Sequence, residues 1–295
     1  MSNLIGIISM FYARPFTREH FPLFRRMKDA GMDFVELLAP EPGELDLRET
    51  RAALQDHGLG VELAARVSLA RDLMSDDPGS RKAGVAYLGY CVDAALALGA
   101  KIVGGPLYGA PLVFAGRPPA PVSEDIRLAR IDRVVGGLKA AARKAESAGI
   151  TLAVEPLNRF ETDFCITTEN AIELVDLVDS PACQLMLDTF HMNIEDGDMP
   201  GAIRAAGQRL KHFQANENHR GFIGSGHVGW AGIASALHDI GYDGPITLEP
   251  FRRDEHRLAV PLAQWRAPEK NEDSELAASA EKLRQFLSAR HTEDC

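Results

Sequence analysis

Eight runs of β-type apolar residues alternate along this chain with eight amphipathic helical stretches. Such alternation predicts an α/β fold built on a parallel sheet. The first run continues into SMFYARPFT, without the glycine-rich phosphate loop that usually follows the first strand of a doubly wound open sheet. A length of 295 residues suits one barrel domain. We therefore predict a single (β/α)8 TIM barrel spanning residues 1–295.

The expected strands are the short apolar runs at residues 4–9, 34–39, 60–66, 101–107, 151–157, 184–188, 210–215 and 246–250. The expected helices follow them at residues 17–31, 47–58, 81–99, 124–149, 167–178, 200–209, 230–241 and 275–290. Each of the first four ends at a glycine, such as Gly31, which suits the left-handed residue after a helix. The fifth opens with a Thr/Asn cap region, and the sixth has Pro200 in its first turn. An insert at about 251–273 follows the eighth strand and precedes a C-terminal helix.

Composition and charge exclude several classes of function. The net charge of −10 repels a phosphate backbone, which argues against a nucleic-acid partner. The chain has no apolar run of about 18 residues, so we expect no transmembrane helix, and its first residues lack the pattern of a signal peptide. Its four cysteines are scattered, with no CxxC motif, which suits free thiols in a reducing compartment and a cytoplasmic location.

Four expected strands in the second half end at an oxygen-bearing side chain: Glu155, Asp188, Gln214 and Glu249. They are spaced by 33, 26 and 35 residues, about one strand-plus-helix unit each, so we expect them at the same end of consecutive parallel strands. A single acid in such a place is usually a helix cap or a surface charge. Three carboxylates gathered at one barrel mouth would instead repel one another unless a cation neutralised them. Their oxygens and the amide suit Mn²⁺ or Mg²⁺ better than zinc, with Co²⁺ as a substitute.

Two histidines lie close to these positions in sequence. His191 follows Asp188 by three residues and could be a metal ligand, a partner of a ligand or a group facing the substrate. His212 lies two residues before Gln214, so both side chains should point to the same face of their strand. It would then lie one layer deeper, as a core histidine or as a group that orients a carboxylate.

At these motifs the chain resembles the ketose 3-epimerases, a group named for D-tagatose 3-epimerase in the xylose-isomerase-like TIM-barrel superfamily. The resemblance covers nearly the whole chain. Its specific matches are VEPLNRFE (154–161), MLDTFHMN (186–193), ANENHRG (215–221) with GSGHVGW (224–230), LEPFRR (248–253) and QWR (264–266).

The resemblance implies that Glu155, Asp188 and Glu249 hold the metal, with Mn²⁺ expected and Mg²⁺ or Co²⁺ as alternatives. The family's remaining ligand is usually a histidine six residues before an arginine that binds substrate. Counting back from Arg220 gives Gln214, so this chain departs from the common pattern. An amide oxygen can still ligate a hard cation, with a different preference or a weaker affinity.

The resemblance also implies that Glu161, His191 and Arg220 contact the carbonyl and hydroxyl oxygens of the substrate. Candidates for contact with the far end of the sugar are Met10, Phe11, Arg66, Tyr108 and Phe114, although loop packing is the expected role of most of them.

The implied activity is metal-dependent 3-epimerisation of free ketoses of the D-tagatose, D-fructose/D-psicose and L-ribulose class. The reaction removes a proton from C3, beside the ketone, and returns one to the opposite face. We assign these transfers to Glu155 and Glu249, through a metal-stabilised enediolate. Arg220 and His191 would hold the oxygens on which negative charge develops. The excess of carboxylates over cations suits a neutral polyol better than a bis-phosphate.

Other functions remain open on the same scaffold. An inosose dehydratase, a keto-inositol isomerase or a hydroxypyruvate isomerase would use the same metal cage with a different pocket. A non-catalytic sugar-binding barrel is favoured only by Gln214. An apurinic endonuclease would need a histidine-rich multi-zinc site and a basic face, which this chain lacks. The resemblance further implies a homodimer or homotetramer, and the apolar insert RLAVPLAQWRAP would contribute to its interface or to the rim of the site.

Overall fold

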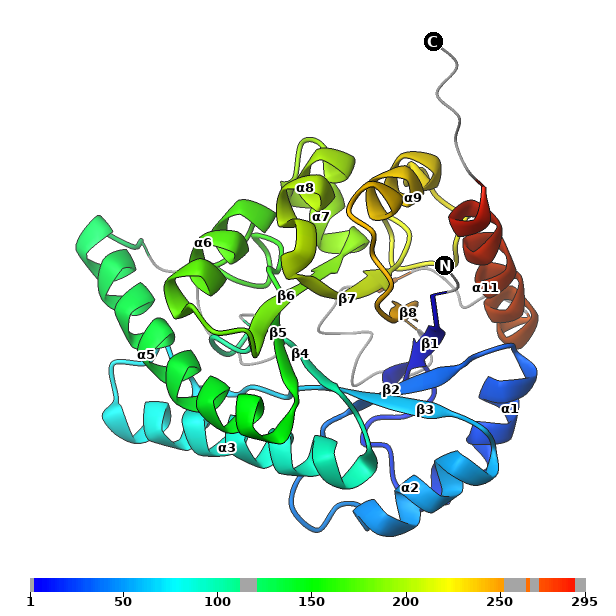
Figure 1. Cartoon of the computed structure of the whole chain (residues 1–295), viewed down its shortest axis with the longest axis horizontal. Coiled ribbons are helices and arrows are strands. Elements are labelled where there is room, and N and C mark those ends of the chain that lie inside the picture. Colours follow the sequence, from blue (N-terminus) through cyan, green and yellow to red (C-terminus); the bar gives the residue numbers. More distant parts are fainter. Residues whose placement is uncertain (1–2, 112–120, 252–263, 266–270, 290–295) are drawn as a thin grey trace.

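The computed structural model describes residues 3–111, 121–251, 264–265 and 271–289. Eight parallel strands form a closed barrel in chain order, and β1 completes the ring by pairing with β8. The helices surround this barrel as an outer layer (Figure 1). The predicted (β/α)8 TIM barrel is therefore confirmed.

The strands are β1 (Ile5–Ile8), β2 (Phe34–Leu38), β3 (Gly60–Ala64), β4 (Ile102–Gly105), β5 (Thr151–Val154), β6 (Cys183–Asp188), β7 (Leu210–Ala215) and β8 (Ile246–Leu248). The described α-helices are α1 (Leu23–Asp29), α2 (Leu47–Asp56), α3 (Pro78–Leu98), α5 (Glu124–Ala148), α6 (Thr168–Val178), α7 (Thr189–Glu195), α8 (Met199–Ala206), α9 (Trp230–Asp239) and α11 (Glu272–Ser288). Short 3₁₀ turns include η1 (Ser9–Phe11) and η2 (Arg18–His20). Each predicted strand overlaps one of these strands, with small differences at the ends.

Local chemistry explains where the helices begin and end. The side chain of Asp46 accepts a hydrogen bond from the backbone of Glu49 at the start of α2, and Thr167 caps α6 in the same way. Gly99 and Gly149 end α3 and α5 with left-handed backbone, at φ values of 90° and 65°. These are positions where glycine avoids the strain that a Cβ atom would cause.

Two helices differ from expectation. The first predicted helix, 17–31, is divided into η2 and α1, and Pro22 stands between them. Proline lacks a backbone N–H and cannot donate the hydrogen bond that continues a helix, so it begins a helix more readily than it continues one. In addition, α7 was not expected. It begins directly after β6 because Asp188 accepts a hydrogen bond from Phe190 N at its start.

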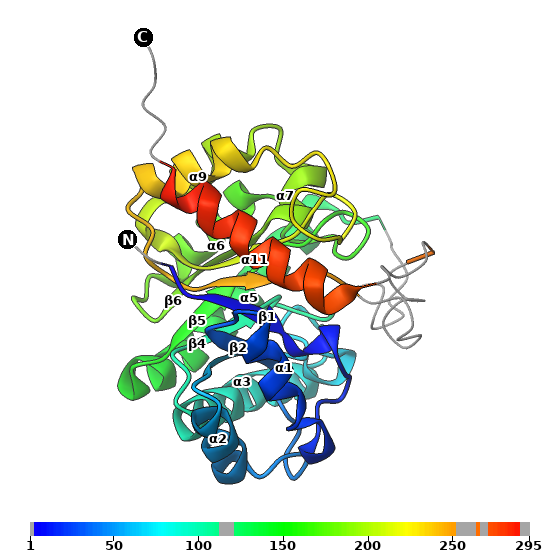
Figure 2. The same cartoon turned by 90° about the vertical axis from the view of Figure 1, so that its right-hand side faces the viewer.

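The C-terminal helix completes the outer layer. α11 lies between α9 and α1 (Figure 2), and the Arg26 guanidinium of α1 binds Asp273 of α11 at 2.7 Å. Most of the predicted insert at 251–273 lies outside the described residues. Among the residues that the structure describes, no helix combines the length and apolar character needed to cross a bilayer.

Candidate active site

The four predicted metal ligands lie at one end of the barrel. Asp188 is the last residue of β6 and pairs in register with Gln214 of β7. Glu155 and Glu249 directly follow β5 and β8, so both stand at the carboxyl ends of their strands. All four are buried, with exposed fractions between 0% and 6%. The rule that successive parallel strands end at the same side therefore predicted their common location correctly.

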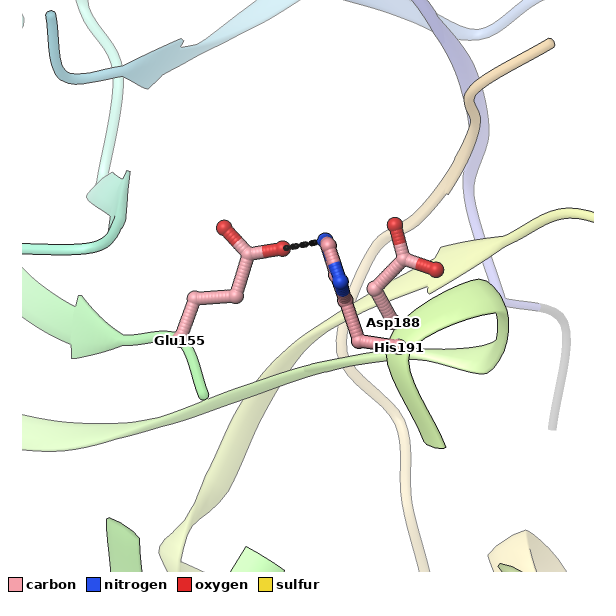
Figure 3. A group of neighbouring side chains, drawn as sticks. All are labelled: Glu155, Asp188 and His191. Carbon is pink, nitrogen blue, oxygen red and sulfur yellow. Dashed lines mark ion pairs between the residues drawn. The ribbon is translucent and has the colours of Figure 1, made fainter. Parts of the chain in front are cut away.

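Glu155, Asp188 and His191 form a compact group (Figure 3). One ligand atom from each lies within 4.8 Å of the others. Glu155 Oε1 lies 3.6 Å from His191 Nε2. The helix α7 begins directly after Asp188 and carries His191 in its first turn, which brings the two side chains together.

The contacts of His191 bear on the three roles left open for it. Its Nδ1 accepts from the backbone N–H of Asn158 at 3.1 Å and lies 2.8 Å from Asn158 Nδ2. The neutral ring therefore carries its hydrogen on Nε2, because a nitrogen that accepts from an N–H cannot carry a hydrogen itself. Nε2 is the atom that faces Glu155. In this tautomer Nε2 donates to an oxygen, whereas in the opposite tautomer the same atom would join Glu155 and Asp188 as a ligand of a metal ion.

Arg220 lies at the centre of the site and joins its carboxylates. Its Nη1 donates to Asp188 Oδ2 at 3.1 Å and to Glu249 Oε2. Its Nη2 lies 3.7 Å from Glu161 Oε1 and 3.1 Å from His191 Nε2. The three residues for which the family resemblance implies substrate contact are thus adjacent to one another.

The guanidinium of Arg220 is held between two aromatic rings. Its Cζ lies 4.1 Å from the centre of the Phe190 ring and 4.4 Å from that of Phe251, and a cation over an aromatic face is favourable. The backbone of Arg220 adopts a left-handed φ of 59°, which is unusual for a residue other than glycine. Such a conformation persists only where the surroundings impose it.

Glu217, which sequence reasoning missed, imposes the shape of the loop that carries Arg220. It is fully buried and accepts hydrogen bonds from Gly224 N at 2.7 Å, Val228 N at 3.2 Å and Trp230 Nε1 at 2.8 Å. A Cβ atom on Gly226 would lie 2.4 Å from Glu217 Oε2, so the loop closes this tightly only because residue 226 is glycine.

Asn216 was also missed. Its Nδ2 donates to both carboxylate oxygens of Asp188 at 3.0 Å, and its Oδ1 has no hydrogen-bond partner among the described residues. Asp188 is thereby held from two sides, by Asn216 and by Arg220.

A buried acid, Glu36, orients the side chain of Gln214. Its Nε2 donates to Glu36 Oε1 and Oε2 at 3.3 and 3.2 Å. Glu36 lies within β2 and also contacts His212 Nε2 at 3.0 Å. His212 is therefore a buried histidine paired with a carboxylate, but that carboxylate is Glu36 and not one of the predicted metal ligands. An acid in the middle of the apolar run FVELLA was the sequence signal for Glu36.

Burial and mutual repulsion dominate the electrostatics. Burial, strengthened by the charge of Asp188, raises the pKa of Glu155 well above its ordinary value. Burial also raises the pKa of Glu249 well above its ordinary value, despite the opposing charge of Arg220. Burial works against ionisation of Asp188 too, but Arg220 and His191 outweigh it and lower the pKa of that carboxyl.

This set of side chains fits a divalent cation. One guanidinium faces four carboxyl groups, those of Glu155, Glu161, Asp188 and Glu249, so negative charge is in excess. The carboxylate oxygens and the amide oxygen of Gln214 are the ligand types that hard cations such as Mn²⁺ and Mg²⁺ prefer. A cation would also relieve the repulsion that raises the pKa of Glu155 and Glu249.

A cavity of about 120 Å³ opens beside these groups and is lined by Glu155, Glu161, His191, Gln214, Arg220 and Glu249 among others. Met10 and Arg66, proposed from the sequence for the far end of a sugar, also line it. Phe11 and Tyr108 are instead packed inside the loop layer, where Tyr108 donates to Cys165 O. Phe114, the remaining candidate, lies outside the described residues. In the QWR motif, Arg266 also lies outside them, and the Trp265 side chain is exposed.

Known proteins share both the sequence pattern and the fold. Residues 24–286 match the model of the xylose isomerase-like TIM barrel family. The chain is 34% identical over 239 residues to the L-ribulose 3-epimerase of Methylomonas sp. (strain DH-1), an alignment covering 80% of this chain and 81% of that protein. It is 30% identical over 291 residues to the D-psicose 3-epimerase of Ruminiclostridium cellulolyticum, covering 96% and 97%.

A solved structure agrees with these relatives. The crystal structure of D-psicose 3-epimerase with D-tagatose from Clostridium cellulolyticum H10 matches with a TM-score of 0.88 and 28% identity, covering 97% of this chain and 100% of that one. A closed barrel, a buried acidic mouth and relatives of this similarity lead to one conclusion: the chain belongs to the xylose isomerase-like TIM barrel family and, within it, to the ketose 3-epimerase group of isomerases.

Proposed function

We propose that the protein is a metal-dependent 3-epimerase of free ketoses of the D-tagatose, D-fructose/D-psicose and L-ribulose class. The observation that carries this proposal is the pair of buried carboxyl groups Glu155 and Glu249, which line one cavity from strands three apart around the barrel. Epimerisation needs a proton acceptor on one face of C3 and a proton donor on the other. Two buried carboxyls that reach one cavity from different strands are suited to these two tasks.

The metal would be held by Glu155, Asp188, Gln214 and Glu249, with Mn²⁺ as the expected ion and Mg²⁺ or Co²⁺ as alternatives. A bound divalent cation supplies polarisation of the substrate carbonyl and stabilisation of negative charge on oxygen. Glu155 and Glu249 then hold and exchange the C3 proton at their carboxylate oxygens. Asn216 and Arg220 both donate to Asp188 and keep it in place.

Arg220 and His191 would bind a substrate oxygen between them. Arg220 Nη2 lies 3.1 Å from His191 Nε2, and both atoms are hydrogen-bond donors in the tautomer that Asn158 imposes. An oxygen of the substrate that lies near both atoms would accept a hydrogen bond from each of them. Asn158 Nδ2 also donates to Glu161 Oε1 at 3.0 Å, which holds Glu161 beside the same position.

A neutral sugar fits the charge of the site. Carboxyl groups outnumber the guanidinium around the cavity, so a phosphate group would be repelled. The named activities of the relatives, L-ribulose 3-epimerase and D-psicose 3-epimerase, support a free ketose for this chain as well.

The test is to follow solvent deuterium. The Mn²⁺-reconstituted protein is mixed with D-fructose, D-tagatose or L-ribulose in D₂O, and the label is located by NMR. We expect a second ketose with deuterium at C3. Deuterium at C1 would indicate a 1,2-enediol and hence an aldose–ketose isomerase. Absence of exchange with each sugar, under Mn²⁺, Mg²⁺ and Co²⁺, would favour a non-catalytic sugar-binding barrel.

Assembly and location remain predictions. We expect a homodimer or homotetramer, and the apolar insert, most of which lies outside the described residues, is expected to contribute to its interface or to the rim of the site. Sedimentation at micromolar concentration should therefore give a mass well above the 32.1 kDa of one chain, and a monomer would contradict it. A cytoplasmic location is supported by Cys91, Cys165 and Cys183, which are free, buried thiols.

A further inference from the structure

Glu36 is a buried acid that no step of the proposed reaction uses. It lies in the middle of β2 with an exposed fraction of 0%. Its two oxygens accept from Gln214 Nε2 at 3.3 and 3.2 Å, although the two residues are 178 positions apart in sequence. A buried carboxylate is costly unless it is well bonded, so its place under Gln214 calls for an explanation.

An amide ligand needs an orienting group, whereas a carboxylate does not. The two ends of a glutamine amide have similar shapes, but one end donates and the other accepts. A rotation of 180° about the last bond would turn the NH₂ group toward a cation and abolish ligation. Because Glu36 can only accept, it keeps the NH₂ end of Gln214 on its own side. The carbonyl oxygen of Gln214 then faces the cavity that it lines with Glu155 and Glu249.

Glu36 is in turn held in place. His212 Nε2 lies 3.0 Å from Glu36 Oε2, and Thr247 Oγ1 lies 3.2 Å from His212 Nε2. His212, Gln214 and Thr247 are all buried, on the adjacent strands β7 and β8. Groups supported on several strands of a closed barrel have little freedom to move, which suits a part that must fix an angle.

We propose that Glu36 is a positioning residue that fixes the amide of Gln214 with its oxygen toward the divalent cation. The inference rests on the proposed function, because it requires a cation at this site. It explains how a glutamine can act as a metal ligand at the position where the family resemblance implies a histidine. It also has an unexpected consequence: glutamate, normally a stronger ligand, should be a poor replacement for Gln214 because its carboxylate would face that of Glu36.

The experiment measures metal affinity by titrating Mn²⁺ into chelator-treated protein in a calorimeter, with no substrate present. We expect Glu36→Gln to weaken Mn²⁺ binding by roughly 10–100-fold, the usual effect of removing a group that orients a ligand. In a Gln214→Leu background the same substitution should have no further effect, because Glu36 acts through Gln214. An equal loss in both backgrounds, or no loss in either, would overturn the proposal.

A matched control and a rescue guard against a general loss of structure. Glu62 pairs in register with Glu36 on the neighbouring strand, but it accepts from Lys101 N and Ile102 N and does not contact Gln214. Glu62→Gln should therefore leave Mn²⁺ affinity unchanged. Gln214→Glu should weaken binding, and the exchanged pair Glu36→Gln with Gln214→Glu should restore it.

The outcomes separate this proposal from the proposed function. If the exchanged pair binds no better than Gln214→Glu alone, the positioning role is wrong while the epimerase proposal stands. If the wild-type protein binds none of Mn²⁺, Mg²⁺ and Co²⁺, both proposals fail.

Discussion

Glu217 accepts a hydrogen bond from the indole nitrogen of Trp230 at 2.8 Å and thereby ties the two ends of the β7–α9 loop together. The loop between them carries Arg220, the residue that joins Asp188 and Glu249. The strained backbone of Arg220 and the placement of its guanidinium thus depend on a carboxylate that does not contact the cavity.

We predict that Glu217→Gln lowers both stability and activity. Three donors point at this buried carboxylate, and an amide would turn an NH₂ group toward one of them. An unsatisfied buried group costs about 1–3 kcal/mol. Displacement of Arg220 should also lower kcat/KM by roughly tenfold or more. Denaturant unfolding and steady-state kinetics test the two effects.

Trp230→Phe is the matched control, because it removes one donor and keeps an aromatic ring. Its losses of stability and activity should be smaller than those of Glu217→Gln. Full activity in a destabilised Glu217→Gln protein would limit Glu217 to stability.

A second prediction concerns Gln214 itself. Gln214→His should keep or improve metal binding, because one ring nitrogen can donate to Glu36 while the other binds the cation. It should also shift the preference from Mn²⁺ toward Co²⁺, since imidazole is a softer ligand than an amide oxygen. Gln214→Leu should weaken Mn²⁺ binding by roughly tenfold or more and lower activity. Unchanged Mn²⁺ affinity of the leucine variant, measured on chelator-treated protein, would show that Gln214 is not a ligand.

The fold and the common location of Glu155, Asp188, Gln214 and Glu249 could be predicted because both follow from local patterns. Apolar runs of strand length, glycines after helices and the spacing of strand ends are all read within short windows of sequence. The helix α7 could not be predicted in the same way, because it is only seven residues long and its cap, Asp188, also belongs to the group of strand-end acids that indicates a metal site.

The supporting residues could not be predicted because their partners are distant in sequence or depend on loop geometry. Glu36 acquires a role only when β2 and β7 face each other across the barrel. Asn216 and Glu217 lie within a recognised motif, yet their contacts exist only once the loop is folded. The donor role of His191 likewise depends on the backbone N–H of Asn158, 33 residues away.

A third prediction concerns pH and uses Glu62, which lies outside the proposed metal site. Burial raises the pKa of Glu62 to about 7. A carboxyl whose pKa is raised by folding favours the folded state while it is protonated. Its contribution is therefore fully present below about pH 4.5 and is lost as the pH rises through about 7. The free energy of unfolding should fall by on the order of 1–3 kcal/mol over this range. This figure follows from about 1.4 kcal/mol per pKa unit, reduced because the side chain is partly exposed.

Glu62→Gln should remove this part of the pH dependence. Denaturant unfolding of the metal-free protein between pH 5 and pH 8 measures it, since a neutral amide keeps its acceptor oxygen for Ile102 N at every pH. We expect the variant to be more stable relative to wild type at pH 8 than at pH 5. If the free energy of unfolding depends on pH in the same way in the two proteins, Glu62 does not titrate in this range.

The last prediction assigns the two faces of the substrate. Glu155 and Glu249 follow strands separated by three positions around the barrel, so each can reach one face of C3. Glu155→Gln and Glu249→Gln should each lower the rate of epimer formation by about 10²–10⁴-fold, the usual contribution of a general acid or base. Loss of a carboxylate from the metal site would add to this, so bound Mn²⁺ must be measured for each variant.

Deuterium exchange separates proton transfer from metal loss. A variant that retains Mn²⁺ and one carboxylate can still remove the C3 proton from the face that this carboxylate reaches, and it can return deuterium to the same face. With a given ketose, one of the two variants should therefore label unreacted substrate at C3 without forming the epimer. With the epimer as substrate, the other variant should do so. If both variants label the same sugar, or if either forms epimer at the wild-type rate, the two carboxyls do not serve opposite faces.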